Sequence, residues 1–390
     1  MHPNTLILRY GEIFLKKGNR HLFERQLLDN IKQYLAQNKI PYKSIIHVGS
    51  RIVINDCADT SVKNVFGLTS VSPALRIRDC KTLEPAKEHV LALAKESGIP
   101  QKTFRITCYR HNKDYYMKSQ EIAAMLGEHV INNIGGKVNL KQPEVDINIE
   151  IIGNDAYLFV EHVPAYGGLP VGSSGKVVSL ISGGIDSPVA SWLMMRRGCN
   201  LIFVHFSSYP QTSRQSEEKV KELVQLLTRF QFHSTLYIVP LLDIQKKMAT
   251  NVDNAYLVIL YRRVMLRIAE MIMRKEGALA LCSGDNLGQV ASQTLPNMVA
   301  IEAAITTPVL RPLLTYDKME IVKLAQKIGT YDISAQPHED CCSLFVPEMP
   351  ETRAKMEYLL KLEEKLKELG IEDDIKIAIG RAMILTVEQG

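Results

Sequence analysis

The sequence predicts a two-part molecule, with an α+β fold in the N-terminal half and an α/β fold on a doubly wound parallel sheet in the C-terminal half. Three observations support this prediction. Up to residue 164, short segments with apolar residues at alternate positions are interspersed with amphipathic helical segments. From residue 177 onward, near-continuous apolar runs alternate with helical segments, as in sheets buried on both faces. Between them, PAYGGLPVGSSGK is dense in Gly, Pro and Ser and predicts a loop at a domain boundary.

In the N-terminal half, strands are predicted where β-branched residues gather. These segments are LILRYG (6–11), IIHVGSRIVIN (45–55), VSPALRIRD (71–79), FRITCYR (104–110) and VDINIEII (145–152). Helical spacing of apolar residues predicts helices over 21–37 and 84–98, the second ending on Gly98.

In the C-terminal half, strands and helices alternate in the order of a doubly wound sheet. Strands are predicted at 176–182, 200–207, 234–241 and 278–284, and helices at 188–198, 216–230 and 255–277. Ligands of such sheets bind beyond the carboxyl ends of the strands, so the residues that end these strands are candidate site residues.

Composition indicates a soluble globular protein of two or three domains, because 390 residues with 46% hydrophobic and 23% charged content exceed one ordinary core. No apolar run approaches the roughly 20 residues that span a bilayer, and Arg9 and Glu12 interrupt any signal-like core. We therefore expect a cytoplasmic protein with no membrane association. The seven cysteines include no CxxC pair, which argues against a zinc site and a disulfide framework.

The positive charge is concentrated near the N-terminus, where residues 1–110 hold 18 Lys and Arg against 9 Asp and Glu. A cluster at Lys16, Lys17, Arg20 and Arg25 lies within this stretch. Such a surplus favours a polyanionic partner, but ordinary solvated helices would give the same counts. Charge alone does not choose between the two.

The segment SGGIDSP at residues 182–188 lies at the end of the first strand of the C-terminal half. Its two glycines allow a phosphate to approach the backbone, and the following helix points N–H groups and the positive end of its dipole at that anion. Ser187 suits the N-cap, Pro188 the first helical position and Gly198 the residue past the helix end. Asp186 is suited to Mg2+. The alternative is a plain turn from strand to helix.

Together with GGLPVGSSGKVVSLISGGIDSPVA, the strings SGDNLGQVASQT and HEDCCSLFVP resemble the tRNA 4-thiouridine synthetase family of PP-loop ATP pyrophosphatases. The segment YGEIFLKKGNRHLFERQL resembles the start of that family's ferredoxin-like domain, although LKKGNR stands where the family reads LKGKNR. The resemblance implies a ferredoxin-like domain over 1–60, an RNA-binding THUMP domain over 61–165, a linker over 166–175 and a PP-loop domain over 176–390.

The resemblance also implies a reaction. ATP and Mg2+ would adenylate O4 of a uridine in tRNA, and a persulfide on Cys342 would deliver sulfur to C4, giving 4-thiouridine, AMP and pyrophosphate. Asp186 and Cys342 are the implied catalytic residues, a cysteine desulfurase is the implied sulfur donor, and some members also supply sulfur for the thiazole of thiamine. A branch of the family carries a second active cysteine on a rhodanese domain, which we do not find before Gly390, so Cys199, Cys282 or an external thiol is left open as the resolving group.

Matching the family motifs residue by residue gives candidate ATP contacts at strand ends, in the nucleotide loop, on a helix and in a later loop. They are Leu180, Ile181, Ser182, Gly183, Gly184, Asp186, Ser187, His205, Phe206, Arg262, Gly284 and Gln293. Each has a simpler interpretation as core or loop, Phe206 above all, and Arg263 could take the place of Arg262.

Candidate RNA contacts are Lys16, Lys17, Arg20, Arg110 and Lys113, with Tyr109 and Tyr115 nearby for base stacking. Each alone is better explained as a solvated surface residue than as a contact. A stripe of apolar residues in the C-terminal helical segment 349–370 predicts packing or an oligomer contact, so a homodimer is also expected as an option. Two rival functions are a PP-loop enzyme acting on a small molecule and a non-catalytic RNA-binding protein.

Overall fold

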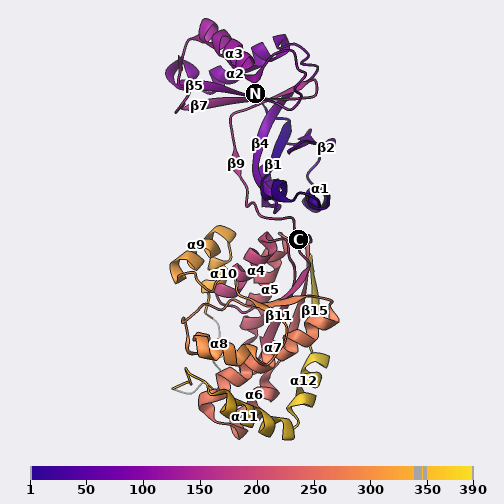
Figure 1. Ribbon diagram of the computed structural model, residues 1–390, viewed down its shortest axis with the longest axis vertical. Helices are drawn as coiled ribbons and strands as arrows, with labels where there is room; N and C mark the ends of the chain where they lie inside the picture. The colour runs from indigo at the N-terminus through magenta and orange to yellow at the C-terminus, as the bar shows by residue number, and fades with distance from the viewer. Residues whose placement is uncertain (1, 338–344, 346–348, 389–390) are drawn as a thin grey trace. The chain divides into compact units, whose positions relative to one another are not determined.

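A computed structural model describes residues 2–337, 345 and 349–388, and the chain divides into two compact units, residues 1–170 and 171–390 (Figure 1). Among the residues described, no helix has the length and apolar character that crossing a bilayer requires.

The N-terminal unit mixes strands and helices, as predicted. Its strands are β1 (Thr5–Tyr10), β2 (Ser44–Val48), β3 (Arg51–Asn55), β4 (Leu68–Ile77), β5 (Thr103–Arg110), β6 (Lys137–Val138), β7 (Val145–Ile152), β8 (Asp155–Phe159) and β9 (Val163–Pro164). Its helices are α1 (Arg20–Gln37), α2 (Glu84–Glu96) and α3 (Ser119–Ile134), with short 3-10 turns η1 (Glu12–Leu15), η2 (Thr60–Asn64) and η3 (Ile99–Gln101).

One long strand, β4, joins the two halves of this unit. The sheet order is β2-β3-β1-β4-β8-β7-β5-β6, and β9 pairs with β4. The first part of β4 pairs with β1, and its last three residues, Leu75 to Ile77, pair with β8. The helices α2 and α3 bury apolar side chains against β5 and β7, which gives the second half its own core.

One sequence expectation for this unit differs from the structure, and one helix was not expected. The run 45–55 is a hairpin of β2 and β3 rather than one strand, because Gly49 adopts a positive φ of 59° and reverses the chain. Helix α3, which no expectation included, begins with a capping box in which the Glu121 side chain accepts from the backbone N–H of Lys118 at 2.8 Å.

The C-terminal unit alternates strands and helices. Its strands are β10 (Lys176–Leu180), β11 (Asn200–Ser207), β12 (His233–Pro240), β13 (Ala280–Cys282), β14 (Val309–Leu310) and β15 (Met383–Glu388). Its helices are α4 (Asp186–Arg196), α5 (Arg214–Thr228), α6 (Leu242–Asn251), α7 (Leu257–Lys275), α8 (Leu295–Glu302), α9 (Lys318–Ile328), α10 (Tyr331–Ala335), α11 (Met356–Glu368) and α12 (Ile371–Gly380), with 3-10 turns η4 (Asn254–Tyr256) and η5 (Ala291–Gln293).

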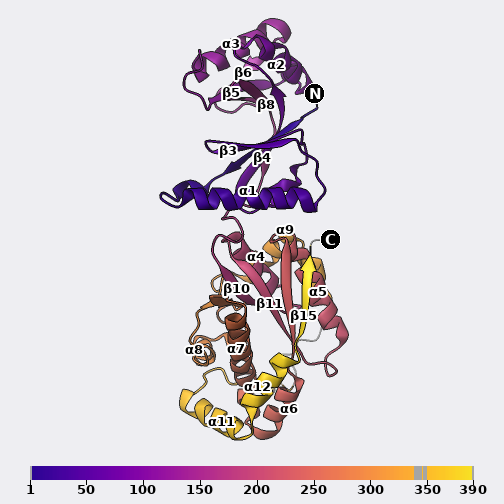
Figure 2. The same cartoon turned by 90° about the vertical axis from the view of Figure 1, so that its right-hand side faces the viewer.

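The sheet of this unit has the order β14-β13-β10-β11-β12-β15, so the chain reverses direction around β10. From β10 it steps outward through α4 and α5 to β12, and α7 then returns it to β13 on the other side of β10. Because such crossovers are right-handed, α4 and α5 cover one face and α7 covers the other (Figure 2). All the pairings are parallel except that of β15, which lies antiparallel to β12 at one edge.

The core of this unit lies around α7, whose buried residues pack between the sheet and α11 and α12. Of the apolar stripe expected in the C-terminal segment, Leu359 and Leu366 are buried in this core, whereas Leu360 is exposed. The stripe therefore serves internal packing. The reversal of the strand order at β10 leaves a crevice beyond the carboxyl ends of β10 and β13, where doubly wound proteins bind ligands.

Candidate active site

The predicted nucleotide loop connects β10 to α4 and is held by hydrogen bonds within itself. The backbone N–H of Ser182 donates to the Ser187 hydroxyl at 2.9 Å, and that hydroxyl lies 3.2 Å from the Ser182 carbonyl oxygen. The N–H of Gly184 donates to the Ser182 hydroxyl at 3.3 Å. The prediction that Ser187 is the N-cap is wrong, because α4 already begins at Asp186 and the hydroxyl bonds back to the loop.

Gly284 follows β13 and lies directly against the start of α4. A Cβ atom at this position would be 2.7 Å from the backbone nitrogen of Ser187 and 2.8 Å from its Cα, which is closer than atoms can approach. Glycine is therefore required for the packing of two backbones, and this packing brings the segment after β13 against the nucleotide loop.

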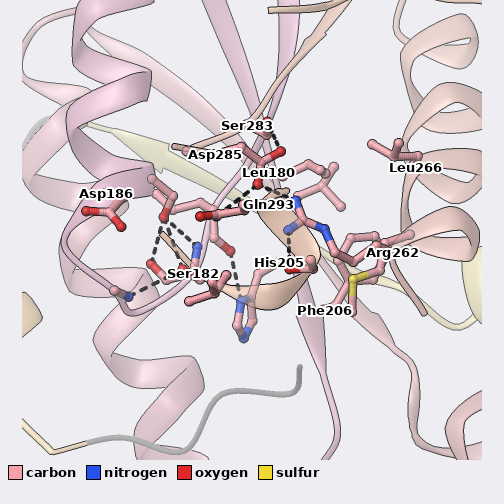
Figure 3. A pocket seen from close by; sticks show the side chains of 18 of the residues that line it. Leu180, Ser182, Asp186, His205, Phe206, Arg262, Leu266, Ser283, Asp285 and Gln293 are labelled. Carbon is pink, nitrogen blue, oxygen red and sulfur yellow. Dashed lines mark hydrogen bonds and ion pairs between the residues drawn. The ribbon is translucent and has the colours of Figure 1, made fainter. Parts of the chain in front are cut away.

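A cavity of about 320 Å³ opens beyond the ends of β10, β11 and β13 (Figure 3). Every predicted ATP residue except Gly183 lines it: Leu180, Ile181, Ser182, Gly184, Asp186, Ser187, His205, Phe206, Arg262, Gly284 and Gln293. The structure thus brings together residues that are up to about a hundred positions apart in the sequence. Further lining residues that the sequence did not indicate are Val204, Val258, Met265, Leu266, Ser283, Asp285, Val290 and Ser292.

One wall of the cavity is apolar and is built from strand ends and α7. Phe206 is 5% exposed at the end of β11, and Met265 and Leu266 of α7 line the same cavity. The ring nitrogen Nδ1 of His205 lies 3.1 Å from the carbonyl oxygen of Ile181, which ties the ends of β10 and β11 together. A wall of this kind suits a flat aromatic group such as a nucleobase.

The polar wall is organised around Asp285, a residue that the sequence prediction missed. The Arg262 guanidinium pairs with Asp285 Oδ1 and donates to the Ser292 hydroxyl at 3.1 Å. Its neighbour Arg263 turns away to Glu363 and the Ala300 carbonyl, so Arg262 is the arginine that faces the cavity.

Asp285 remains ionised despite its burial. Burial by itself favours the neutral acid, but the positive charge and hydrogen bond of Arg262, the Ser283 hydroxyl at 2.8 Å and the charge of Arg311 at 3.4 Å together hold the pKa of Asp285 at about 2. The Gln293 side-chain nitrogen Nε2 donates to the same carboxylate at 3.3 Å. Asp285 thus connects three separate segments around the cavity.

Asp186, at the other side of the cavity, accepts hydrogen bonds from two side chains outside the loop. Lys318 Nζ lies 2.6 Å from Oδ1, and Gln289 Nε2 lies 3.0 Å from Oδ2. Lys318 begins α9 and was not indicated by the sequence. Among the described residues no group of three or more His, Cys, Asp and Glu side chains is arranged to hold a metal ion.

The predicted sulfur carrier Cys342 and its neighbour Cys341 lie outside the described residues. The helix before them, α10, is fixed to the nucleotide loop, since the Ser334 hydroxyl donates to the Gly184 carbonyl at 3.2 Å. Lys219, which is buried, donates to the carbonyls of Ser334 and Gln336 at 2.8 and 2.6 Å. The chain that leads to the cysteine pair therefore starts beside the loop.

The other cysteines are poorly suited to resolve a persulfide intermediate. Cys199 and Cys282 are buried, and burial raises the pKa of both thiols, that of Cys282 to about 12. A protonated, inaccessible thiol is a poor nucleophile. Cys57, Cys80 and Cys108 are also buried, as expected for structural residues.

The candidate RNA residues form two groups in the N-terminal unit. Lys16 and Lys17 follow η1, and Arg20, at the start of α1, pairs with Glu24 at 2.7 Å and stacks on Phe14 at 4.0 Å. Arg110 ends β5, Lys113 lies between β5 and α3, and Arg110 donates to the Tyr115 carbonyl at 3.1 Å.

The two tyrosines named for stacking differ in the structure. Tyr109 is exposed, whereas the hydroxyl of Tyr115 donates to the Cys80 carbonyl at 2.7 Å and burial raises its pKa. Tyr116, beside it, is the more exposed ring. Tyr109 and Tyr116 are therefore better placed than Tyr115 to meet a base.

Family models match three parts of the chain. A model described as thiamine biosynthesis protein (ThiI) matches residues 172–368, a THUMP domain model matches 80–161, and a ThiI ferredoxin-like domain model matches 5–72. The first match lies in the C-terminal unit and the other two lie in the N-terminal unit.

Relatives that match more than nine tenths of the chain are named as tRNA sulfurtransferases. Probable tRNA sulfurtransferases from Halothermothrix orenii and Geobacillus sp. (strain WCH70) are 41% and 40% identical, covering 99% and 93% of this chain and 99% and 91% of their own.

Solved structures are similar as well. The crystal structure of a 4-thiouridine synthetase–RNA complex with bound ATP matches with a TM-score of 0.89 and 34% identity over 99% of this chain and 100% of that one. PH1313 from Pyrococcus horikoshii matches with a TM-score of 0.64 and 26% identity over 84% of this chain and 99% of that one.

Proposed function

Because the chain belongs to the ThiI family of tRNA sulfurtransferases, we propose that it replaces O4 of a uridine in tRNA by sulfur with consumption of ATP. The products would be 4-thiouridine, AMP and pyrophosphate. The observation that carries this proposal is the cavity at the reversal of the strand order, where a glycine-rich loop, a helix N-terminus and an apolar wall meet.

The two walls of the cavity suit the two parts of ATP. The apolar wall around Phe206 suits the adenine, and the backbone N–H groups of the loop, with the positive end of α4, suit the phosphates. The similar 4-thiouridine synthetase has ATP bound in its crystal structure, which supports the same ligand here.

The chemistry requires an activated carbonyl and a soft nucleophile. A uracil carbonyl is a poor electrophile, and transfer of the adenylyl group to O4 turns that oxygen into part of a good leaving group, AMP. A persulfide anion on Cys342 would then attack C4 and displace AMP, and an external thiol would cleave the S–S bond, which leaves the sulfur on C4 and Cys342 in a disulfide with that thiol. Cys342 follows α10, which the Ser334 hydroxyl ties to the loop, and this connection supports its assignment.

Asp186 and Lys318 fit roles beside the phosphates. Mg2+ in nucleotide sites is commonly held by one or two carboxylates together with phosphate oxygens, and Asp186 is the carboxylate among the described cavity residues that lies next to the nucleotide loop. Bound Mg2+ would neutralise charge on the phosphates. Lys318, already 2.6 Å from Asp186, would add a second positive charge there.

The partners we propose are tRNA and a cysteine desulfurase that supplies the persulfide sulfur. The similar synthetase was crystallised with RNA, and the N-terminal unit of this chain matches a THUMP domain model. Sulfur supply to the thiazole of thiamine is a second proposal, because the matching family model is described as a thiamine biosynthesis protein. A strain lacking the gene should then require thiazole for growth.

The experiment combines purified protein, unmodified tRNA transcript, Mg-ATP, a cysteine desulfurase and cysteine. We expect pyrophosphate release and the near-ultraviolet absorbance of 4-thiouridine to rise together. Pyrophosphate release without thiolated tRNA would favour a PP-loop enzyme with a small-molecule substrate, and RNA binding with neither product would favour a binding protein.

A paired substitution tests the sulfur carrier. Cys342→Ser should abolish thiolation while tRNA and ATP still bind, because only the nucleophile is lost. The matched control is Cys341→Ser, which should retain most of the activity. Thiolation by the Cys342→Ser protein at the wild-type rate would contradict the assignment.

A further inference from the structure

The Gln293 side chain presents a buried acceptor to the cavity that no described residue satisfies. The residue is 9% exposed, and its oxygen Oε1 has no hydrogen-bond partner within the described part of the chain. A buried acceptor without a donor costs free energy, so such an atom in a cavity marks the place of a ligand donor.

The orientation of this amide is set by its neighbour. Nε2 of Gln293 lies 3.3 Å from Asp285 Oδ1, and an ionised carboxylate can only accept hydrogen bonds. The nitrogen must therefore face Asp285, and the oxygen is left for the cavity. The backbone is held too, because Gln293 N–H donates to the Val290 carbonyl and the Gly288 N–H donates to the Gln293 carbonyl, both at 2.8 Å.

We infer that Asp285 is a positioning residue that fixes the Gln293 amide so that its oxygen selects a nucleotide carrying a hydrogen-bond donor at that point. Asp285 also holds Arg262 and is itself held by Ser283 (Figure 3). Arg311 lies 3.4 Å from its Oδ2 atom as well, so the carboxylate has little freedom to turn. This inference rests on the proposed function, because the ligand it concerns is ATP.

The chemistry of ATP limits what the donor can be. At about pH 8 its phosphates only accept hydrogen bonds, and the remaining donors are the 6-amino group of adenine and the 2′ and 3′ hydroxyls of the ribose. The shared requirement is a donor on the nucleoside part. Four analogues each change one of them: inosine triphosphate and purine riboside triphosphate at position 6, and 2′-deoxy-ATP and 3′-deoxy-ATP on the sugar.

The measurement is the dissociation constant of ATP and of each analogue by calorimetry, on the full chain. For wild type we expect the analogue that lacks the relevant donor to bind about 5- to 100-fold more weakly than ATP, as for a buried acceptor left unsatisfied. The analogue that shows the loss identifies the donor as amine or hydroxyl.

Substitution then separates positioning from folding. In Asp285→Asn the new amide can donate or accept, so Gln293 is free to turn, and the preference for ATP over that analogue should fall to within about threefold. Gln293→Leu should lose the preference as well, because the acceptor is gone. Asp285→Glu keeps an acceptor-only carboxylate and should restore part of the preference.

Arg311→Lys is the matched control. It changes a partner of Asp285 Oδ2 and leaves the contact of Oδ1 with Gln293 in place, so the preference should remain. A purely structural role for Asp285 predicts instead that ATP and all analogues weaken by one common factor in Asp285→Asn.

Equal weakening of ATP and of all four analogues in Asp285→Asn would overturn the inference. A wild-type protein that binds ATP and all four analogues equally would also overturn it. If Asp285→Asn does not fold, the Asp285→Glu protein decides in its place: a preference lost as completely as in Gln293→Leu would count against the inference. A wild-type protein that binds none of the nucleotides would refute the proposed function, which is a different result.

Discussion

Each unit of the molecule contains a deeply buried carboxylate held by two arginines, but the two carboxylates serve different ends. In the N-terminal unit, Glu150 accepts from Arg9 at 2.6 Å, Arg51 at 2.9 Å and His111 at 2.9 Å. Burial opposes its ionisation, yet these three partners hold the pKa of Glu150 at about 2. Asp285 in the C-terminal unit has a pKa depressed to a similar value.

The two carboxylates differ in where the hydrogen-bond networks of their partners end. Arg9 donates onward to the Ser72 hydroxyl and Arg51 to the Ser50 hydroxyl, so the Glu150 network ends within the protein and joins β1 and β3 to β7. The Asp285 network ends at a cavity, with one acceptor unsatisfied by the residues that the structure describes. Of these two depressed pKa values, only that of Asp285 accompanies a network that leaves a polar atom for a ligand, so the pKa alone does not identify the candidate site.

The largest effect should follow from removing Glu150. Glu150→Leu leaves Arg9 and Arg51 buried without their counter-charge, and breaking a buried pair in this way costs about 3–5 kcal/mol of the free energy of unfolding. Hydrogen exchange of β1 and β7 amides should report this loss. Fluorescence of Trp192, the single tryptophan, should show that the C-terminal unit unfolds as before.

The matched control is Glu161→Gln, which removes an exposed carboxylate from the same unit and should change stability by less than about 0.5 kcal/mol. If Glu150→Leu changed stability as little as this control, Glu150 would not stabilise the junction of β1 and β3 with β7. The contrast between the two carboxylates would then disappear.

Lowering the pH should remove the stabilisation that ionised Glu150 and ionised Asp285 each provide, and the loss should be larger for Glu150. A carboxyl group whose folded pKa lies below its ordinary value stabilises the protein above that ordinary value, and the stabilisation is lost as the pH falls toward the folded pKa. From pH 5 to pH 2 we expect a loss of ~3 kcal/mol from Glu150 and ~2 kcal/mol from Asp285, whose ordinary pKa values are 4.5 and 3.8.

The measurement is the difference in unfolding free energy between wild type and Glu150→Leu, and between wild type and Asp285→Asn, at several pH values. Both differences should shrink as the pH falls, because protonation removes in wild type the charge that each variant lacks. A difference that is constant across this range would show that the carboxylate does not titrate as described.

The smallest effect concerns charges that lie on the surface. Reversing Lys16, Lys17 and Lys113 to Glu should weaken tRNA binding about tenfold or more and lower the slope of log K against log salt by somewhat under one for each phosphate that is no longer neutralised. Arg20 and Arg110 are left intact because both hold internal hydrogen bonds. The control reverses Lys246, Lys361 and Lys367, exposed residues of the C-terminal unit. An equal loss of binding in the control would mean that the N-terminal group has no special role.

The sequence predicted the fold class because strand and helix periodicities are local properties. The sequence shows apolar strands before and after the glycine-rich loop, and the sheet is doubly wound as predicted. The position of its reversal, at β10, was found only in the structure. The hairpin at Gly49 was predicted as one strand because its two arms are both β-branched and only two residues separate them. The antiparallel β15 was missed because the pairing of an edge strand depends on the tertiary fold.

The candidate site was predicted in part, for the same reason. The loop and the strand ends follow from local pattern and family resemblance, and the structure gathers them in one cavity. Asp285 was missed although it closely follows a predicted strand, because its partners Arg262 and Arg311 lie 23 and 26 positions away. Likewise the sequence could not separate Arg262 from Arg263, since only their partners distinguish them.

The reversal of the strand order at β10 also has a consequence for synthesis on the ribosome. β10 pairs with β13, so Val177 can pair with Ala280 only after about a hundred more residues have been synthesised. The sheet is complete only after β15, residues 383–388, has been synthesised. The N-terminal unit contains all its own strands by Pro164. Since domains fold as they emerge, we expect the nascent chain to complete the THUMP-containing unit before the nucleotide cavity exists. The growing chain would then pass through a stage in which the unit proposed to bind RNA is folded and the cavity proposed to bind ATP is not.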